Sequence, residues 1–131
     1  MTPAARLQLI HDDIAAAAKL AKREPSDVTL IAVSKTREAA EIAPLIAAGQ
    51  RHFGESRVQE ALGKWPALLE RHPDITLHCV GRLQSNKAAE ALRLFDVVHS
   101  LDRPSLLAAL AGEAGKQRRS PAVYVGTAFK F

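Results

Sequence analysis

Lys35 is the residue best placed for chemistry in this chain of 131 residues. It ends the apolar segment 28–33, in the string LIAVSKTR. A lysine at the end of a buried strand can reach into a pocket, where dehydration lowers the pKa of its amine. The neutral amine can then attack an aldehyde and form a Schiff base. Lysines also end strands simply to meet water, so both interpretations stay open at this point.

The composition indicates one globular domain with a real core, because 47% of the residues are hydrophobic and 24% are charged. The chain contains no apolar run of about eighteen residues that would span a membrane. Its first segment carries charges among the apolar residues, unlike a secretory signal peptide. Cys79 is the only cysteine in the sequence, which rules out an internal disulfide and agrees with a reducing compartment. We therefore expect a cytoplasmic protein.

The formal net charge is +4, which is compatible with an anionic partner. The basic residues are spread out, and the one short cluster, residues 116–119, has few aromatic neighbours for base stacking. The cluster is better interpreted as a solvated helix end or loop than as a nucleic-acid site, and the charge is equally compatible with an anionic small molecule. His78 and His99 are expected to be strand histidines with satisfied hydrogen bonds, since their separation is not that of a metal site.

Apolar periodicity and turn residues predict helices that alternate with short strands. The expected helices cover residues 4–23, 38–48, 56–70, 87–94 and 104–114, and the expected strands cover residues 28–34, 50–54, 75–80, 96–99 and 122–125. This alternation favours an α/β fold whose parallel sheet is buried on both faces.

Active sites of such folds gather at the carboxyl ends of the strands. That rule selects Lys35 after the first strand, Glu55 and Ser56 after the second, Gly81–Lys87 after the third, and His99–Arg103 after the fourth. These segments contain the polar residues that a pocket would need.

Four ordered motifs carry a resemblance to a known family. They are AVSKTR at 32–37, AAGQRHFGESRVQEAL at 47–62, HCVGRLQSNK at 78–87 and FDVVHSLDR at 95–103. Together they resemble the pyridoxal phosphate homeostasis protein family, also called the YggS or PROSC family, over residues 5–120.

The resemblance implies a (β/α)8 barrel like the amino-terminal domain of alanine racemase. Pyridoxal 5'-phosphate would be held as a Schiff base on Lys35. Family members are regarded as carriers and regulators of the vitamin B6 pool rather than as enzymes, with apo-enzymes that use this cofactor as recipients. The single domain, 1–131, would comprise an amino-terminal helix (1–25), βα units (26–120) and a divergent tail (121–131).

Several residues of these motifs keep two interpretations. Ser56 stands where the family usually has Asn, and it is shorter, although it can still contact the cofactor. Asn86 and its neighbours lie at a strand-to-helix junction that could either bind an anion or cap the helix. Gly54 lets the backbone turn, with or without a ligand beside it. Glu55 is expected to hold a neighbouring loop, and Glu60 to be a helix-face residue with surface partners.

The carboxyl terminus departs from the family, because barrels of this type usually need about 200 residues or more and this chain supplies about five strands. Their phosphate sites come from loops after the seventh and eighth strands. The string VGTAF at 125–129 resembles the family's last-strand motif, so Gly126 and Thr127 are further candidates for cofactor binding. Either an internal deletion or a truncation or frameshift would explain this end.

A partial barrel leaves unpaired strand edges, and such edges tend to pair with other chains. We therefore expect marginal stability or self-association, and a Schiff base at Lys35 that is more exposed than in a complete barrel. Two other functions stay open: an enzyme of the racemase type, or a degenerate fragment that binds no cofactor.

Overall fold

The computed structural model describes residues 1–125, which form five β-strands and five α-helices. The helices are α1 (Pro3–Leu20), α2 (Ala39–Ala47), α3 (Val58–Arg71), α4 (Ala88–Leu94) and α5 (Pro104–Gln117), with short 3-10 turns η1 (Pro25–Asp27) and η2 (Ser85–Lys87). The strands are β1 (Ala32–Val33), β2 (His52–Glu55), β3 (Thr76–Cys79), β4 (Val97–Leu101) and β5 (Ala122–Val125). No helix among residues 1–125 is long and apolar enough to cross a membrane.

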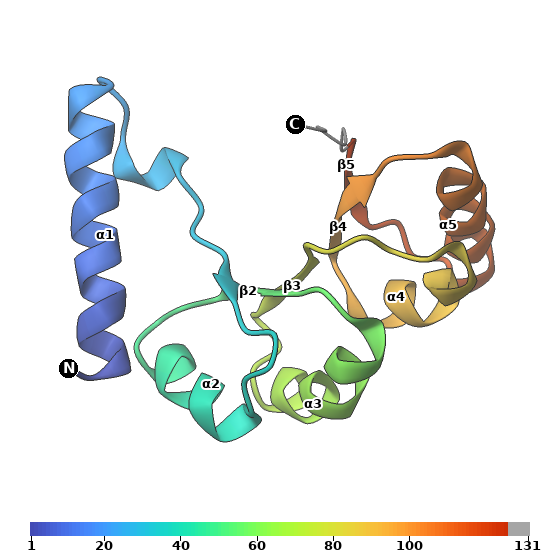
Figure 1. The fold of residues 1–131 in the computed structure, drawn as a ribbon, viewed down its shortest axis with the longest axis horizontal. Coiled ribbons are helices and arrows are strands. Elements are labelled where there is room, and N and C mark those ends of the chain that lie inside the picture. The colour runs from blue at the N-terminus through green and yellow to red at the C-terminus, as the bar shows by residue number, and fades with distance from the viewer. Residues whose placement is uncertain (126–131) are drawn as a thin grey trace.

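The strands form one sheet in the order β1-β2-β3-β4-β5, and every neighbouring pair is parallel. Each strand therefore pairs with the next one along the chain, as in a βα barrel. Figure 1 shows α2 to α5 along one face of the curved sheet, while α1 lies at the β1 end, where it contacts α2. The predicted partial barrel with about five parallel strands is confirmed.

The core lies between the sheet and the helices α2 to α5, a face that we call the outer face. Side chains alternate along a strand, so Phe53, Leu77 and Val98 all point to this layer. Trp65 of α3 packs on Phe53 with ring centroids 5.1 Å apart, and both side chains have no solvent exposure. Further core residues from the helices are Ile42, Ile46, Ala61, Leu68, Ala91, Leu92, Leu106 and Leu110.

The opposite face, which we call the inner face, is not covered by a helix among the described residues (Figure 1). Val33 is 52% exposed and Tyr124 is 58% exposed. The expectation of a sheet buried on both faces is therefore wrong for residues 1–125. The strand sequences could not reveal this, because the inside of a barrel is also apolar when it is filled.

The first strand is much shorter than expected. Only Ala32 and Val33 form β1, whereas the apolar segment predicted a strand over 28–34. The ladder between β1 and β2 pairs only Ala32 with Phe53 and Val33 with Gly54, and residues 28–31 lie outside it. The side-chain amide of Gln50 instead donates to the carbonyl of Leu30 at 2.7 Å. The apolar residues 28–31 thus lead into the sheet without forming a strand themselves.

Candidate functional site

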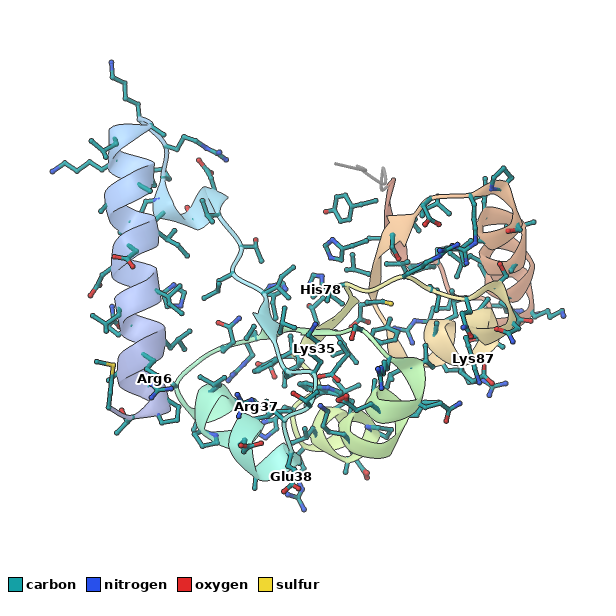
Figure 2. The ribbon with its side chains drawn as sticks, in the orientation of Figure 1. Arg6, Lys35, Arg37, Glu38, His78 and Lys87 are labelled. Carbon is teal, nitrogen blue, oxygen red and sulfur yellow. The ribbon has the colours of Figure 1, made fainter. Side chains whose placement is uncertain are left out.

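Lys35 lies at the carboxyl end of β1, two residues beyond Val33, and its side chain is exposed, so the described residues do not place it in a dehydrated pocket. Val33 is in register with Gly54, and Gly54 with His78, so Val33 faces the inner side of the sheet with His78. The Ser34 amide still donates to the Gly54 carbonyl, so the alternation of β1 extends to its end and directs Lys35, in the turn that follows, to that same side. Figure 2 shows Lys35 next to the end of β1 and Lys87 farther away, near α4.

Lys64 of α3 holds the backbone on both sides of Lys35. Its Nζ donates to the carbonyl of Ser34 at 2.9 Å and to the carbonyl of Arg37 at 2.8 Å. The Lys64 side chain is 10% exposed; its bond to Ser34 is partly buried, and its bond to Arg37 lies at the exposed surface. The loop that carries Lys35 is therefore fixed from the helix layer.

Two carboxylates complete this arrangement. Glu55, at the end of β2, is fully buried; its Oε2 lies 3.1 Å from Lys64 Nζ and accepts a hydrogen bond from the Ser34 hydroxyl. Glu60 accepts the amide hydrogen of Thr36, with N–O distances of 2.8 and 3.2 Å, and lies 3.4 Å from Lys64 Nζ. We call Glu55, Glu60 and Lys64 the loop clamp.

The amide of Thr36 is the main cause that lowers the pKa of Glu60, and the positive charge of Lys64 adds to it. The expectation that Glu55 holds a neighbouring loop is confirmed. The expectation that Glu60 is a helix-face residue with surface partners is confirmed, because it lies on α3 and its carboxylate binds the amide of Thr36, an exposed residue of the Lys35 loop. Sequence reasoning missed Lys64, although its spacing of four residues from Glu60 on a helix was a signal of an ion pair.

Ser56 follows β2 and is packed closely against the end of β3. A Cβ atom at Gly81 would lie 2.6 Å from Ser56 Cβ and 2.9 Å from Ser56 Cα, so glycine is required for this approach. Ser56 lines a depression of about 320 Å³ with Arg57, Arg82 and Lys87, and no carboxylate contributes to its lining. The depression is suited to an anionic group.

Asn86 is exposed within η2 and lines a different depression, against α5. The structure therefore does not bring Asn86 together with Ser56. The expectation that Ser85 and Asn86 cap the following helix is wrong, because neither η2 nor α4 has a side-chain cap. A 3-10 turn continues into α4 and already bonds the Ala88 amide to the Ser85 carbonyl.

Gly54 was expected at a turn, yet it lies inside β2. A Cβ there would meet Ile31 and Val80 side chains at 3.1 Å, so its small size serves packing of β2 between the residue that precedes β1 and the residue that follows β3. Gly126 and Thr127 lie outside the described residues.

A row of aromatic rings crosses the inner face. His52 Nδ1 lies 3.0 Å from His78 Nε2, and His78 Nδ1 lies 2.9 Å from His99 Nε2. Tyr124 stacks on His99 with a centroid distance of 5.1 Å. Burial, with the neighbouring His99 and His52, lowers the pKa of His78 to about 4. The expectation that His78 and His99 are satisfied strand histidines is confirmed; His52 and Tyr124 were not foreseen.

Residues 6–127 match the family model described as "Alanine racemase, N-terminal domain". The pyridoxal phosphate homeostasis protein of Escherichia coli K12 is 44% identical over 98 residues, which are 74% of this chain and 42% of that protein. The protein of the same name from Synechocystis is 42% identical over 97 residues, covering 74% and 44%.

Solved structures of similar proteins agree with the sequence relatives in the family that they indicate. PipY of Synechococcus elongatus PCC7942, solved with PLP bound, is 50% identical with a TM-score of 0.72, over 84% of this chain and 52% of PipY. A crystal structure described as that of an unknown protein from Bifidobacterium adolescentis is 32% identical with a TM-score of 0.85, over 92% of this chain and 52% of that one. The chain spans about half the length of the relatives that it matches. It belongs to the alanine racemase N-terminal domain family.

Proposed function

We propose that this chain binds pyridoxal 5'-phosphate as a Schiff base on Lys35 and serves vitamin B6 homeostasis. The observation that carries the proposal is the Lys35 amine, exposed at the carboxyl end of β1 on a loop whose backbone is held on both sides of it. The names of the curated relatives and the PLP-bound structure of PipY support the same cofactor.

The bond chemistry suits a carrier. The neutral Nζ of Lys35 adds to the aldehyde carbon, one water molecule leaves, and a carbon–nitrogen double bond forms without oxidation or reduction. Addition of water reverses the reaction and returns both partners. Because the step is reversible and consumes no substrate, we propose storage and release of the cofactor rather than turnover, in agreement with the homeostasis names of the relatives.

The donor set of the described residues fits a phosphate-bearing aldehyde. Lys35 supplies the amine, and the depression beside Ser56 supplies Arg57, Arg82 and Lys87 with no carboxylate in its lining. Because the loops after β1, β2 and β3 meet at one edge of a parallel sheet, these groups share that edge. We still predict cofactor contacts for Ser56 and Asn86. The same prediction stands for Gly126 and Thr127, which lie outside the described residues.

Titration with pyridoxal phosphate tests the proposal. We expect an absorption band of the Schiff base that saturates with one cofactor per chain, that is absent in Lys35→Ala, and that persists in the control Lys19→Ala on exposed α1. A band of equal strength in Lys35→Ala would contradict the assignment. Racemisation of an added amino acid by the loaded protein would contradict the carrier role.

A further inference from the structure

We propose that the loop clamp, Glu55, Glu60 and Lys64, positions Lys35 for bond formation with the cofactor aldehyde. We do not propose that any of the three side chains contacts the cofactor. They act on the backbone of the loop 34–37. The inference rests on the proposed function, because it concerns how readily Lys35 forms the Schiff base.

Lys64 is a mostly buried cation next to the loop that carries Lys35. A lysine that is 10% exposed has lost most of its hydration, so its charge needs compensation. Two carboxylates supply that compensation, at 3.1 Å from Glu55 and at 3.4 Å from Glu60. Its remaining hydrogen bonds go to the carbonyls of Ser34 and Arg37, which flank Lys35 in sequence. The buried charge is thus directed at the segment that bears the reactive amine.

Thr36, the residue after Lys35, has an unusual backbone conformation. Its φ is +65°, in the left-handed region that β-branched residues rarely adopt. Such a conformation persists only where the surroundings hold it, and here both oxygens of Glu60 bind the Thr36 amide. If this contact is removed, Thr36 is expected to relax to ordinary backbone angles. The peptide that links Thr36 to Lys35 would then turn, and the amine would change its direction.

Glu55 ties the other flank of Lys35 to the sheet. It has no solvent exposure and accepts from the hydroxyl of Ser34, the residue directly before Lys35. The Ser34 amide also donates to the Gly54 carbonyl at 2.9 Å, in continuation of the β1–β2 pairing. Side chains on the outer face therefore fix the residues on either side of Lys35, while Lys35 itself faces the inner side.

The test compares Schiff-base formation in folded variants. Glu60→Ala removes the acceptor of the Thr36 amide at a partly exposed position, and Glu60→Gln restores an oxygen acceptor without the charge. Lys64→Met removes the ammonium group but keeps an apolar stem. Glu70→Ala, an exposed residue on the same helix, is the matched control. Circular dichroism and thermal unfolding select the temperature at which every variant is folded.

The expected result is a loss of about tenfold in the equilibrium constant for bond formation at Lys35 in Glu60→Ala and in Lys64→Met, the size of effect that follows loss of charge-assisted hydrogen bonds. Glu60→Gln should recover part of the loss, and Glu70→Ala should match the unmodified chain. Unchanged constants in folded Glu60→Ala would overturn the positioning role while the proposed function stands. Absence of any Lys35 adduct in the unmodified chain would overturn both.

Discussion

The two faces of the sheet have opposite chemistry although they share the same strands. On the outer face, Phe53, Leu77 and Val98 are fully buried against four helices. On the inner face lie His52, His78 and His99, which we call the histidine row. The exposed side chains of Val33 and Tyr124 lie on the same face. Alternation along each strand keeps the two sets apart. Packing therefore depends on the outer face, and the proposed chemistry belongs to the inner face.

The loop clamp joins these two faces. Glu55 and Lys64 sit in or beside the helix layer, and they hold the backbone that flanks an inner-face lysine. A rigid, buried layer can position a reactive group more precisely than an exposed loop can. The difference between the faces is thus a division of roles, and substitutions on each face should have different effects.

The largest effect is expected for Trp65→Ala on the outer face. Trp65 has no exposure and packs on Phe53, so its truncation should leave a cavity and lower the free energy of unfolding by about 3–5 kcal/mol. Urea unfolding followed by circular dichroism measures this. Tyr124→Ala on the inner face is the comparison, and an equal loss for both variants would contradict the division between the faces.

A smaller effect is expected where two strand ends approach each other. In Gly81→Ala, the added methyl group must displace the Ser56 backbone, which should cost about 1–3 kcal/mol in unfolding free energy. Gly63→Ala is the control, because a Cβ there meets nothing within 4 Å on helix α3, and it should leave stability equal or improved. If Gly81→Ala were as stable as the control, the close contact with Ser56 would be disproved.

The histidine row should make stability depend on pH. His78 in the folded chain has a pKa lowered to about 4, against an ordinary value of 6.5. Between these values the unfolded chain binds more protons than the folded one, so stability should fall as the pH drops from 6.5 towards 4. His78→Gln should flatten this slope in pH-dependent urea unfolding, whereas His11→Gln, exposed on α1, should not. Identical slopes in all three proteins would rule out His78 as the source.

The smallest effect is expected for Val33→Thr. Val33 is about half exposed on the inner face, so a hydroxyl there should change the unfolding free energy by no more than about 0.5 kcal/mol. The same change at fully buried Val98, on the outer face, should cost about 1–3 kcal/mol because the hydroxyl loses water. Thermal unfolding of the two variants measures the loss of stability in each. Equal losses would contradict the difference between the two faces.

Local patterns in the sequence were enough to predict most of the elements. The predicted helix over 38–48 is α2, Ala39–Ala47, and the predicted strand over 75–80 is β3, Thr76–Cys79. Proline and glycine at the element ends, with regular apolar spacing between them, carry this information locally. Lys35 as the candidate reactive residue likewise followed from its place after an apolar segment.

The loop clamp could not be predicted from the same patterns. Lys64 is 29 residues from Lys35, and its bonds to Ser34 and Arg37 exist only because α3 packs back beside the end of β1. The positive φ of Thr36 has no sequence signal, since threonine is unusual in that region. The proximity of His52, His78 and His99 depends on strand register, which the apolar segments do not specify.

The most direct test of the account is to find the lysine that bonds the cofactor aldehyde. The chain is incubated with pyridoxal phosphate, reduced with borohydride to fix the bond, digested and mapped by mass spectrometry. We predict a stable pyridoxyl group on the peptide containing Lys35, at one group per chain, with Lys64 and Lys87 unmodified. Labelling spread over the exposed lysines, or labelling that excludes Lys35, would contradict the account.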